Sequence, residues 1–130
     1  MSLVSTPMSV GELIDKITIL EIKADKIKDP SKLKNINHEL QLLTATWQDT
    51  GLVSEITNEL KQALKAVNLK LWKIEDDIRI FEKNKNFGDE FVQLARSVYY
   101  QNDDRAAIKK QINEATGSEL TEEKSYESYV

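Results

Sequence analysis

Cysteine is absent from the 130-residue sequence, and histidine occurs only once. Without cysteine the chain can form neither a disulfide nor a thiol nucleophile, and a single histidine excludes the usual zinc sites built from cysteine and histidine. Any bound metal would therefore need oxygen ligands alone. The redox compartment stays open, because a chain without cysteine suits either an oxidising or a reducing environment.

The sequence also lacks a long apolar segment and an excess of positive charge. No run of about 18 apolar residues is present that could span a membrane, and the opening MSLVSTPMSV has neither the basic head nor the apolar core of a signal peptide. The formal net charge of -4 gives no general attraction for phosphate backbones. We therefore expect a cytoplasmic protein that binds neither membranes nor nucleic acid, and no cofactor is indicated.

Glycine and proline are scarce, at 4 and 2 residues, so few positions interrupt the helical spacing of the apolar residues. The first predicted helix begins after Ser9, with Glu12 placed to complete a capping box. Pro30 suits the first turn of a second helix, whose apolar stripe reaches Trp47 and ends near Gly51.

The longest apolar stripe runs without glycine or proline from about Val53 to Lys85 and predicts a helix roughly 50 Å long. The sequence NFGD ends it. A fourth helix is predicted through EFVQLARSVYY, and Asn102 suits the cap of a fifth helix that ends before Gly117. The predicted fold class is all-α, a long antiparallel helical hairpin or open bundle around one helix of about 30 residues.

The helices predict a single domain at residues 9–117, preceded by an N-terminal extension at residues 1–8. Residues 118–130 form a polar tail, SELTEEKSYESYV, which has no helical period. Tyr126 and Tyr129 could anchor this tail, so we expect it to be partly docked on the domain.

Five charged residues border apolar stripes instead of facing away from them. Glu21 lies beside the stripe of the first helix, and Glu75 beside that of the third, with Arg79 one turn further on. Arg105 and Lys109 flank the stripe of the last helix. The simplest interpretation is a partly buried salt-bridge network that fixes the helix register, with Glu75 held by Arg105.

The same residues allow functional alternatives. Arg79, Arg105 and Lys109 could bind the phosphate or carboxylate of a small anion, with the glutamates orienting them. A pocket of this kind would be chorismate-mutase-like, except that the arginine of the first helix is missing and only Lys16 and Lys23 could replace it.

A magnesium site is a further alternative. Glu21, Asp25, Glu75 and Asp76 could supply its carboxylates, as in helical nucleotide pyrophosphohydrolases. The two close pairs of acids that such enzymes carry on their helices are missing, because EIKAD has the wrong spacing and EDDIR lacks a second member.

Four segments span most of the chain: SVGELIDKITILEIK, LWKIEDDIR, ARSVYYQNDDRAAIKKQIN and LTEEKSY. In these segments the chain resembles a small all-helical family of unknown function that occurs in bacteria and their phages. Because that family carries no established activity, the resemblance implies relatives and a helical fold but no mechanism.

These features favour a non-enzymatic binding or scaffolding module, and the alternative is a protein or enzyme that binds a small anion through its cationic cluster. We also expect a homo-oligomer, most simply a dimer. A compact domain of this length has a diameter of about 36 Å, whereas the third helix is roughly 50 Å long and apolar throughout. A second copy would cover the overhanging part of its stripe.

Overall fold

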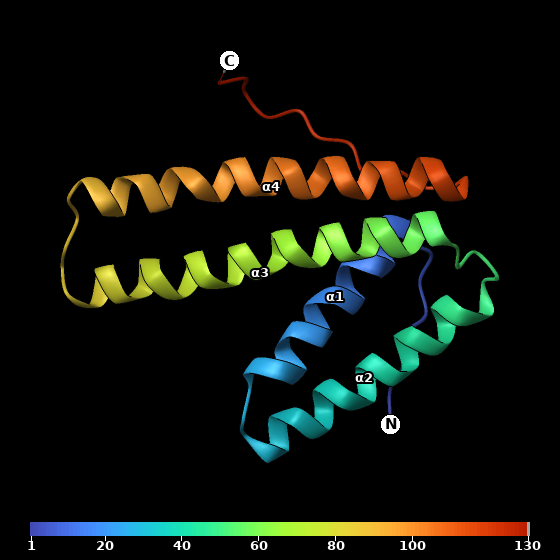
Figure 1. Cartoon of the computed structure of the whole chain (residues 1–130). Coiled ribbons are helices and arrows are strands. Elements are labelled where there is room, and N and C mark those ends of the chain that lie inside the picture. The colour runs from blue at the N-terminus through green and yellow to red at the C-terminus, as the bar shows by residue number, and fades with distance from the viewer. Residues whose placement is uncertain (130) are drawn as a thin grey trace.

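The computed structural model describes residues 1–129, in which four helices and no strand occur. Two long helices form an antiparallel hairpin, and a shorter pair lies beneath one end of it (Figure 1). The predicted all-α hairpin is confirmed, and its central helix has 29 residues. In chain order the helices are α1 (Val10–Lys26), α2 (Pro30–Asp49), α3 (Glu55–Lys83) and α4 (Asp89–Thr116).

Side chains next to the first turn fix the start of three helices. The Ser9 hydroxyl accepts a hydrogen bond from the Glu12 amide at 3.1 Å and caps α1. Asp29 caps α2 just before its first-turn proline. Ser54 and Thr57 form a reciprocal capping box on α3. These contacts satisfy amide groups that the first helical turn leaves without an internal partner.

The predicted break at Asn102 is wrong, because α4 continues through it as a single helix of 28 residues. An interior asparagine or aspartate costs only about 0.7 kcal/mol relative to alanine, and no glycine or proline accompanies them here. A continuous helix keeps its backbone hydrogen bonds across Asn102. It also keeps the half-buried Val98 and Ile108, which lie on either side of Asn102, in the same helix. Together these gains outweigh the weak preference of asparagine for a cap.

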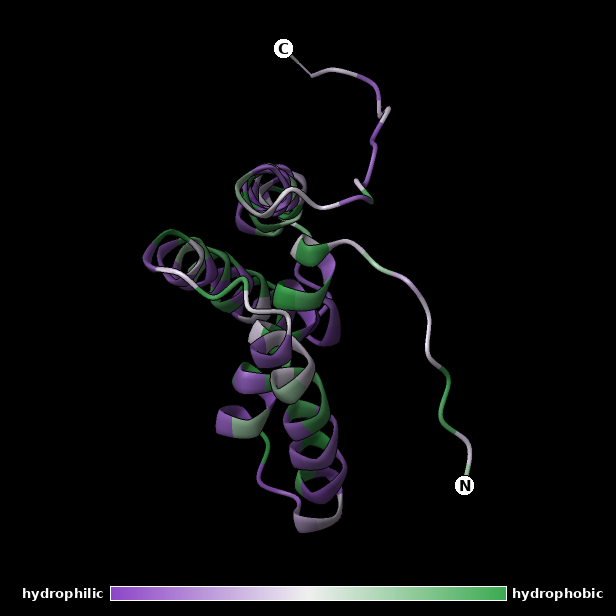
Figure 2. Cartoon of the chain, turned by 90° about the vertical axis from the view of Figure 1, so that its right-hand side faces the viewer, coloured by the Kyte–Doolittle hydropathy of each residue, from purple (hydrophilic) through white to green (hydrophobic). Residues whose placement is uncertain are grey.

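The core lies around α1, which is the only helix whose backbone approaches all three others within residues 1–129. The backbone of α2 approaches α1 alone. Figure 2 looks along α4 and shows the α1 and α2 pair extending from one side of the hairpin. The core cluster joins all four helices and consists of Leu13, Ile14, Ile17, Trp47, Leu64 and Ile112.

The far half of the hairpin, residues 71–104, projects beyond α1 and α2 (Figure 1). We call this part the arm. It contains no fully buried residue, although its apolar side chains continue the stripes of α3 and α4. Ile80 is 55% exposed and Val92 is 46% exposed. In the arm, α3 and α4 therefore pack mainly against each other, and much of their remaining surface is exposed.

Candidate functional site

Asp15 is the most deeply buried acid of the chain among the described residues, with 1% of its surface exposed. Its Oδ1 accepts hydrogen bonds from Asn68 Nδ2 at 2.9 Å and from Arg105 Nε at 3.0 Å. Its Oδ2 accepts a second bond, from Arg105 Nη2. The two-point contact suits the planar guanidinium and fixes α4 against α1.

The Asn68 amide also donates to the buried Thr18 hydroxyl at 3.0 Å, and this hydroxyl donates to the Asp15 carbonyl at 2.8 Å. The buried polar atoms of three helices are therefore tied to one another. A buried carboxylate is costly unless it is paired and hydrogen-bonded, and Asp15 meets both conditions. The hydrogen bonds to Asp15 raise the pKa of Arg105 above its usual value, so its charge is permanent.

Lys109, one turn beyond Arg105 on α4, is buried among three carboxylates. Its Nζ lies 2.7 Å from Glu12 and 2.8 Å from Glu122 of the tail, and 3.9 Å from Asp15. Burial alone lowers the pKa of Lys109, but the bonds to Glu12 and Glu122 outweigh it and raise the pKa. Lys109 therefore stays charged and joins α1, α4 and the tail.

The first turn of α1 is seated directly on the end of α4. The Gly11 amide donates to Asn113 Oδ1 at 2.7 Å, and the Val10 amide donates to Ser118 Oγ at 3.2 Å. A Cβ atom on Gly11 would lie 2.6 Å from the Lys109 carbonyl oxygen. Only glycine allows this close approach, and the amides that could otherwise attract an anion already have partners.

The five predicted site residues lie at three separate places in the structure. They are Glu21, Glu75, Arg79, Arg105 and Lys109. Arg105 and Lys109 face inward together, as described above. Glu21 binds Lys61 at 3.1 Å and Lys65 at 3.5 Å on another part of α3.

Glu75 and Arg79 pair with each other at 3.2 Å on the surface of the arm, where their side chains are 60% and 78% exposed. The expected pair between Glu75 and Arg105 is therefore wrong. Arg105 is held by Asp15, which lies closer to the core and offers two oxygen atoms to the guanidinium. A salt-bridge network is present, as predicted, but most of its acids are different.

The acids that were missed are Glu12, Asp15 and Glu122. A second stripe on α1 could have indicated Asp15, because a helix that is apolar on two sides is buried on two sides, and an acid there needs a cation. This stripe has the three-and-four spacing of a helical face and consists of Gly11, Ile14, Asp15, Thr18 and Ile22. No comparable signal in the sequence indicates Asn68 or Glu122.

A groove of about 310 Å³ opens where the arm leaves α1. We call it the arm groove. Its apolar part includes Ile22, Leu71 and Trp72. Glu75, Arg79 and Arg105 all lie at its charged rim, although Arg105 pairs with Asp15 and not with Glu75. The full lining is Ile19, Ile22, Asn68, Leu71, Trp72, Glu75, Asp76, Arg79 and Arg105.

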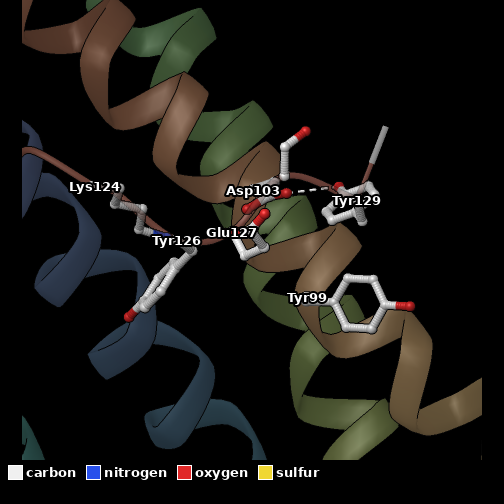
Figure 3. A pocket seen from close by; sticks show the side chains of 7 residues that line it. Tyr99, Asp103, Lys124, Tyr126, Glu127 and Tyr129 are labelled. Carbon is white, nitrogen blue, oxygen red and sulfur yellow. Dashed lines mark hydrogen bonds between the residues drawn. The ribbon is translucent and has the colours of Figure 1, made fainter.

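The tail runs back along α4, and its attachments include Glu122 and Tyr129. Glu122 binds Lys109, which lowers the pKa of Glu122. Tyr129 donates a hydrogen bond to Asp103 at 2.6 Å, and this bond raises the pKa of Tyr129 to about 12. Figure 3 shows the side chains of Tyr99 and Tyr129 beside α4. Both line a hollow of about 550 Å³ between the tail and the helix.

Residues 1–129 contain neither an assembled metal site nor a helix suited to span a membrane. No group of three or more histidine, aspartate or glutamate side chains is close enough to hold a metal ion there. The alternative based on Glu21, Asp25, Glu75 and Asp76 therefore lacks an assembled ligand set. None of the four helices has the length and apolar composition that a bilayer crossing requires.

Comparison with known proteins identifies a family whose function is unknown. No curated protein matches the chain, and no solved structure matches it. One family model covers residues 4–130 and is described as a family of unknown function. Because this match spans nearly the entire sequence, the chain belongs to the family of unknown function DUF6165.

Proposed function

We propose that the protein is a non-enzymatic helical module that binds a protein partner along the arm groove. The observation that carries this proposal is the pairing of the charged cluster. Arg105 is bound at two points by Asp15, and Lys109 lies between Glu12 and Glu122. Cations that already have acids at hydrogen-bond distance have little capacity left for a substrate, so the cluster serves as an internal lock between helices.

The arm groove has the chemistry of a surface that binds proteins. Leu71 and Trp72 provide apolar and aromatic contact area, while Glu75 and Arg79 at the rim neutralise each other. An aromatic centre with a polar rim is typical of protein interfaces, and grooves beside helices commonly accept a partner helix. The arm is also the part of the fold with no buried residue of its own.

One observation favours a second candidate function, the binding of a small anion. The groove is open beside Arg105, and Arg79 lies on the same surface. Against it, each of these arginines has a carboxylate at hydrogen-bond distance, Asp15 for Arg105 and Glu75 for Arg79. An incoming anion would compete with these acids, and an Asp15 that lost Arg105 would keep only Asn68 and, at 3.9 Å, Lys109 beside its buried charge.

Thermal melting in the presence of inorganic phosphate, pyrophosphate or citrate tests the choice. We expect each salt to change the melting temperature no more than sodium chloride of equal ionic strength. Arg105→Met and Lys109→Met should lower the melting temperature equally with and without these anions. A saturable rise in melting temperature that Arg105→Met removes would overturn the proposal in favour of the small-anion function.

A further inference from the structure

The proposed function leaves the partner unnamed, and on that basis we propose that the occupant of the arm groove is the arm of a second copy of this chain. In the proposed assembly, the α3 helices of the two copies run antiparallel to each other. The two-fold axis that relates the copies passes between the helices at the level of Asp77. The two hairpins then form a four-helix bundle, and the α1 and α2 pairs lie at its opposite ends.

The extent of the open arm suits this arrangement. From residue 71 to residue 83, α3 continues for about 20 Å beyond the part that α1 covers. Two such segments overlap fully when they run antiparallel, so each lies along the open side of the other. Antiparallel bundles of four helices are a common way to close the open faces of a hairpin, and two-fold dimers are the commonest oligomers.

The charges of the groove are self-complementary about this axis. Glu75 and Arg79 lie two residues before and two residues after Asp77 and both line the groove. In an antiparallel pair centred on Asp77, Glu75 of one copy faces Arg79 of the other, and the reverse contact occurs as well. A two-fold interface needs one surface that matches itself, and a single acid and base pair placed symmetrically meets this need.

The remaining surroundings leave the groove accessible to a second arm. Its lining residues come from α1, α3 and α4, and no tail residue is among them. The tail fastens instead to Lys109 and to Asp103. The side chains of Glu75 and Arg79 are 60% and 78% exposed, so both are available for contacts between copies.

Charge reversal tests the arrangement directly. Light scattering at micromolar concentration should give the mass of two chains for the unaltered protein. Glu75→Arg and Arg79→Glu each place like charges across the axis, so each should weaken self-association at least about tenfold. An equimolar mixture of the two variants should recover the dimer, because each copy then faces the opposite charge. Loss of dimer without recovery in the mixture would overturn the proposed register.

Lys73→Glu is the matched control. Lys73 also pairs with an acid one turn away, Asp77 at 3.1 Å, and its side chain is 78% exposed, the same as that of Arg79. It does not line the arm groove. The proposal requires this variant to remain dimeric, and a loss of association as large as that of Arg79→Glu would overturn it.

Leu71→Cys separates a failure of this inference from a failure of the proposed function. The chain contains no other cysteine, so the labelling rate of this thiol reports the groove alone. If the protein is a monomer and the thiol reacts rapidly, the proposal that a second copy occupies the groove is overturned. The groove would then remain accessible to a different protein. A monomer in which the thiol is protected would overturn the proposed function too. A dimer with a protected thiol, exposed again by Arg79→Glu, supports both.

Discussion

Asp15 and Arg105 lie 90 residues apart in the sequence and form an ion pair at two points, in which Asp15 is buried and Arg105 is partly exposed at the arm groove. Removing one partner of such a pair leaves the other charge buried, so Arg105→Met should lower the free energy of unfolding by roughly 3 to 5 kcal/mol. Adding Asp15→Leu should cost less than the sum of the two single changes. Urea denaturation measures both effects.

The exposed acid Glu59, which lies outside the arm groove, provides the control for this cycle. Glu59→Ala should change the unfolding free energy by no more than about 0.5 kcal/mol. Strictly additive losses from the Asp15 and Arg105 variants would contradict the structure, since they would show that the two side chains do not interact.

Gly11→Ala should destabilise the domain, although alanine is normally the better helix former by about 1 kcal/mol. The new Cβ would lie 2.6 Å from the Lys109 carbonyl oxygen, a backbone atom that can move only if α1 and α4 separate. We expect a net loss of roughly 1 to 3 kcal/mol in thermal or urea unfolding. A gain in stability would show that α1 does not approach α4 this closely.

Trp47→Ala should release α2 from the rest of the fold. Trp47 is 3% exposed and is the α2 member of the core cluster, and such truncations cost about 3 to 5 kcal/mol. Hydrogen exchange should accelerate in α2 before it does in α3. His38→Ala on the exposed side of the same helix should leave exchange unchanged, and equal effects of the two variants would contradict this packing.

Docking of the tail should weaken in acid. Lys109 lowers the pKa of Glu122 below its ordinary value of 4.5. A group whose pKa is lower in the docked state stabilises that state above the ordinary pKa and loses this contribution as the pH falls through the lowered value. The amide NMR signals of residues 118–129 should therefore shift toward those of an undocked tail below about pH 4.5. Glu122→Gln should remove this transition, and an identical transition in the variant would assign it to another group.

The positions of all four helices, α3 and α4 of the hairpin and the α1 and α2 pair, can largely be predicted from patterns that are local in the sequence. The stripe of α3 and the residues at its ends predict its length closely, because burial of one helical face is enough to set that period. Asn102 misled the prediction for α4, since a residue that favours a cap still costs little inside a helix. Gly51 has a φ of +72°, the left-handed conformation expected at the end of α2.

The candidate site was harder to predict because it depends on which helices meet. A helical wheel correctly predicts that Arg105 and Lys109 face the other helices, but it does not identify which helix lies opposite them. Glu75 lies at the edge of a long stripe, yet α1 covers only the other half of α3, so Glu75 remains exposed. The acid that α1 brings to Arg105 is Asp15, which lies on the second apolar side of that helix.

The hydrogen bonds from Val10 to Ser118 and from Gly11 to Asn113 have a consequence for the order of folding. During synthesis α1 emerges first, but the groups that seat its first turn are made more than 100 residues later. Until then, α1 can pack only against α2 and α3, and its buried Asp15 can meet Asn68 of α3 but not the cation Arg105. Contacts between residues so far apart in the sequence slow folding, so the final step should be the packing of α4 against both α1 and α3.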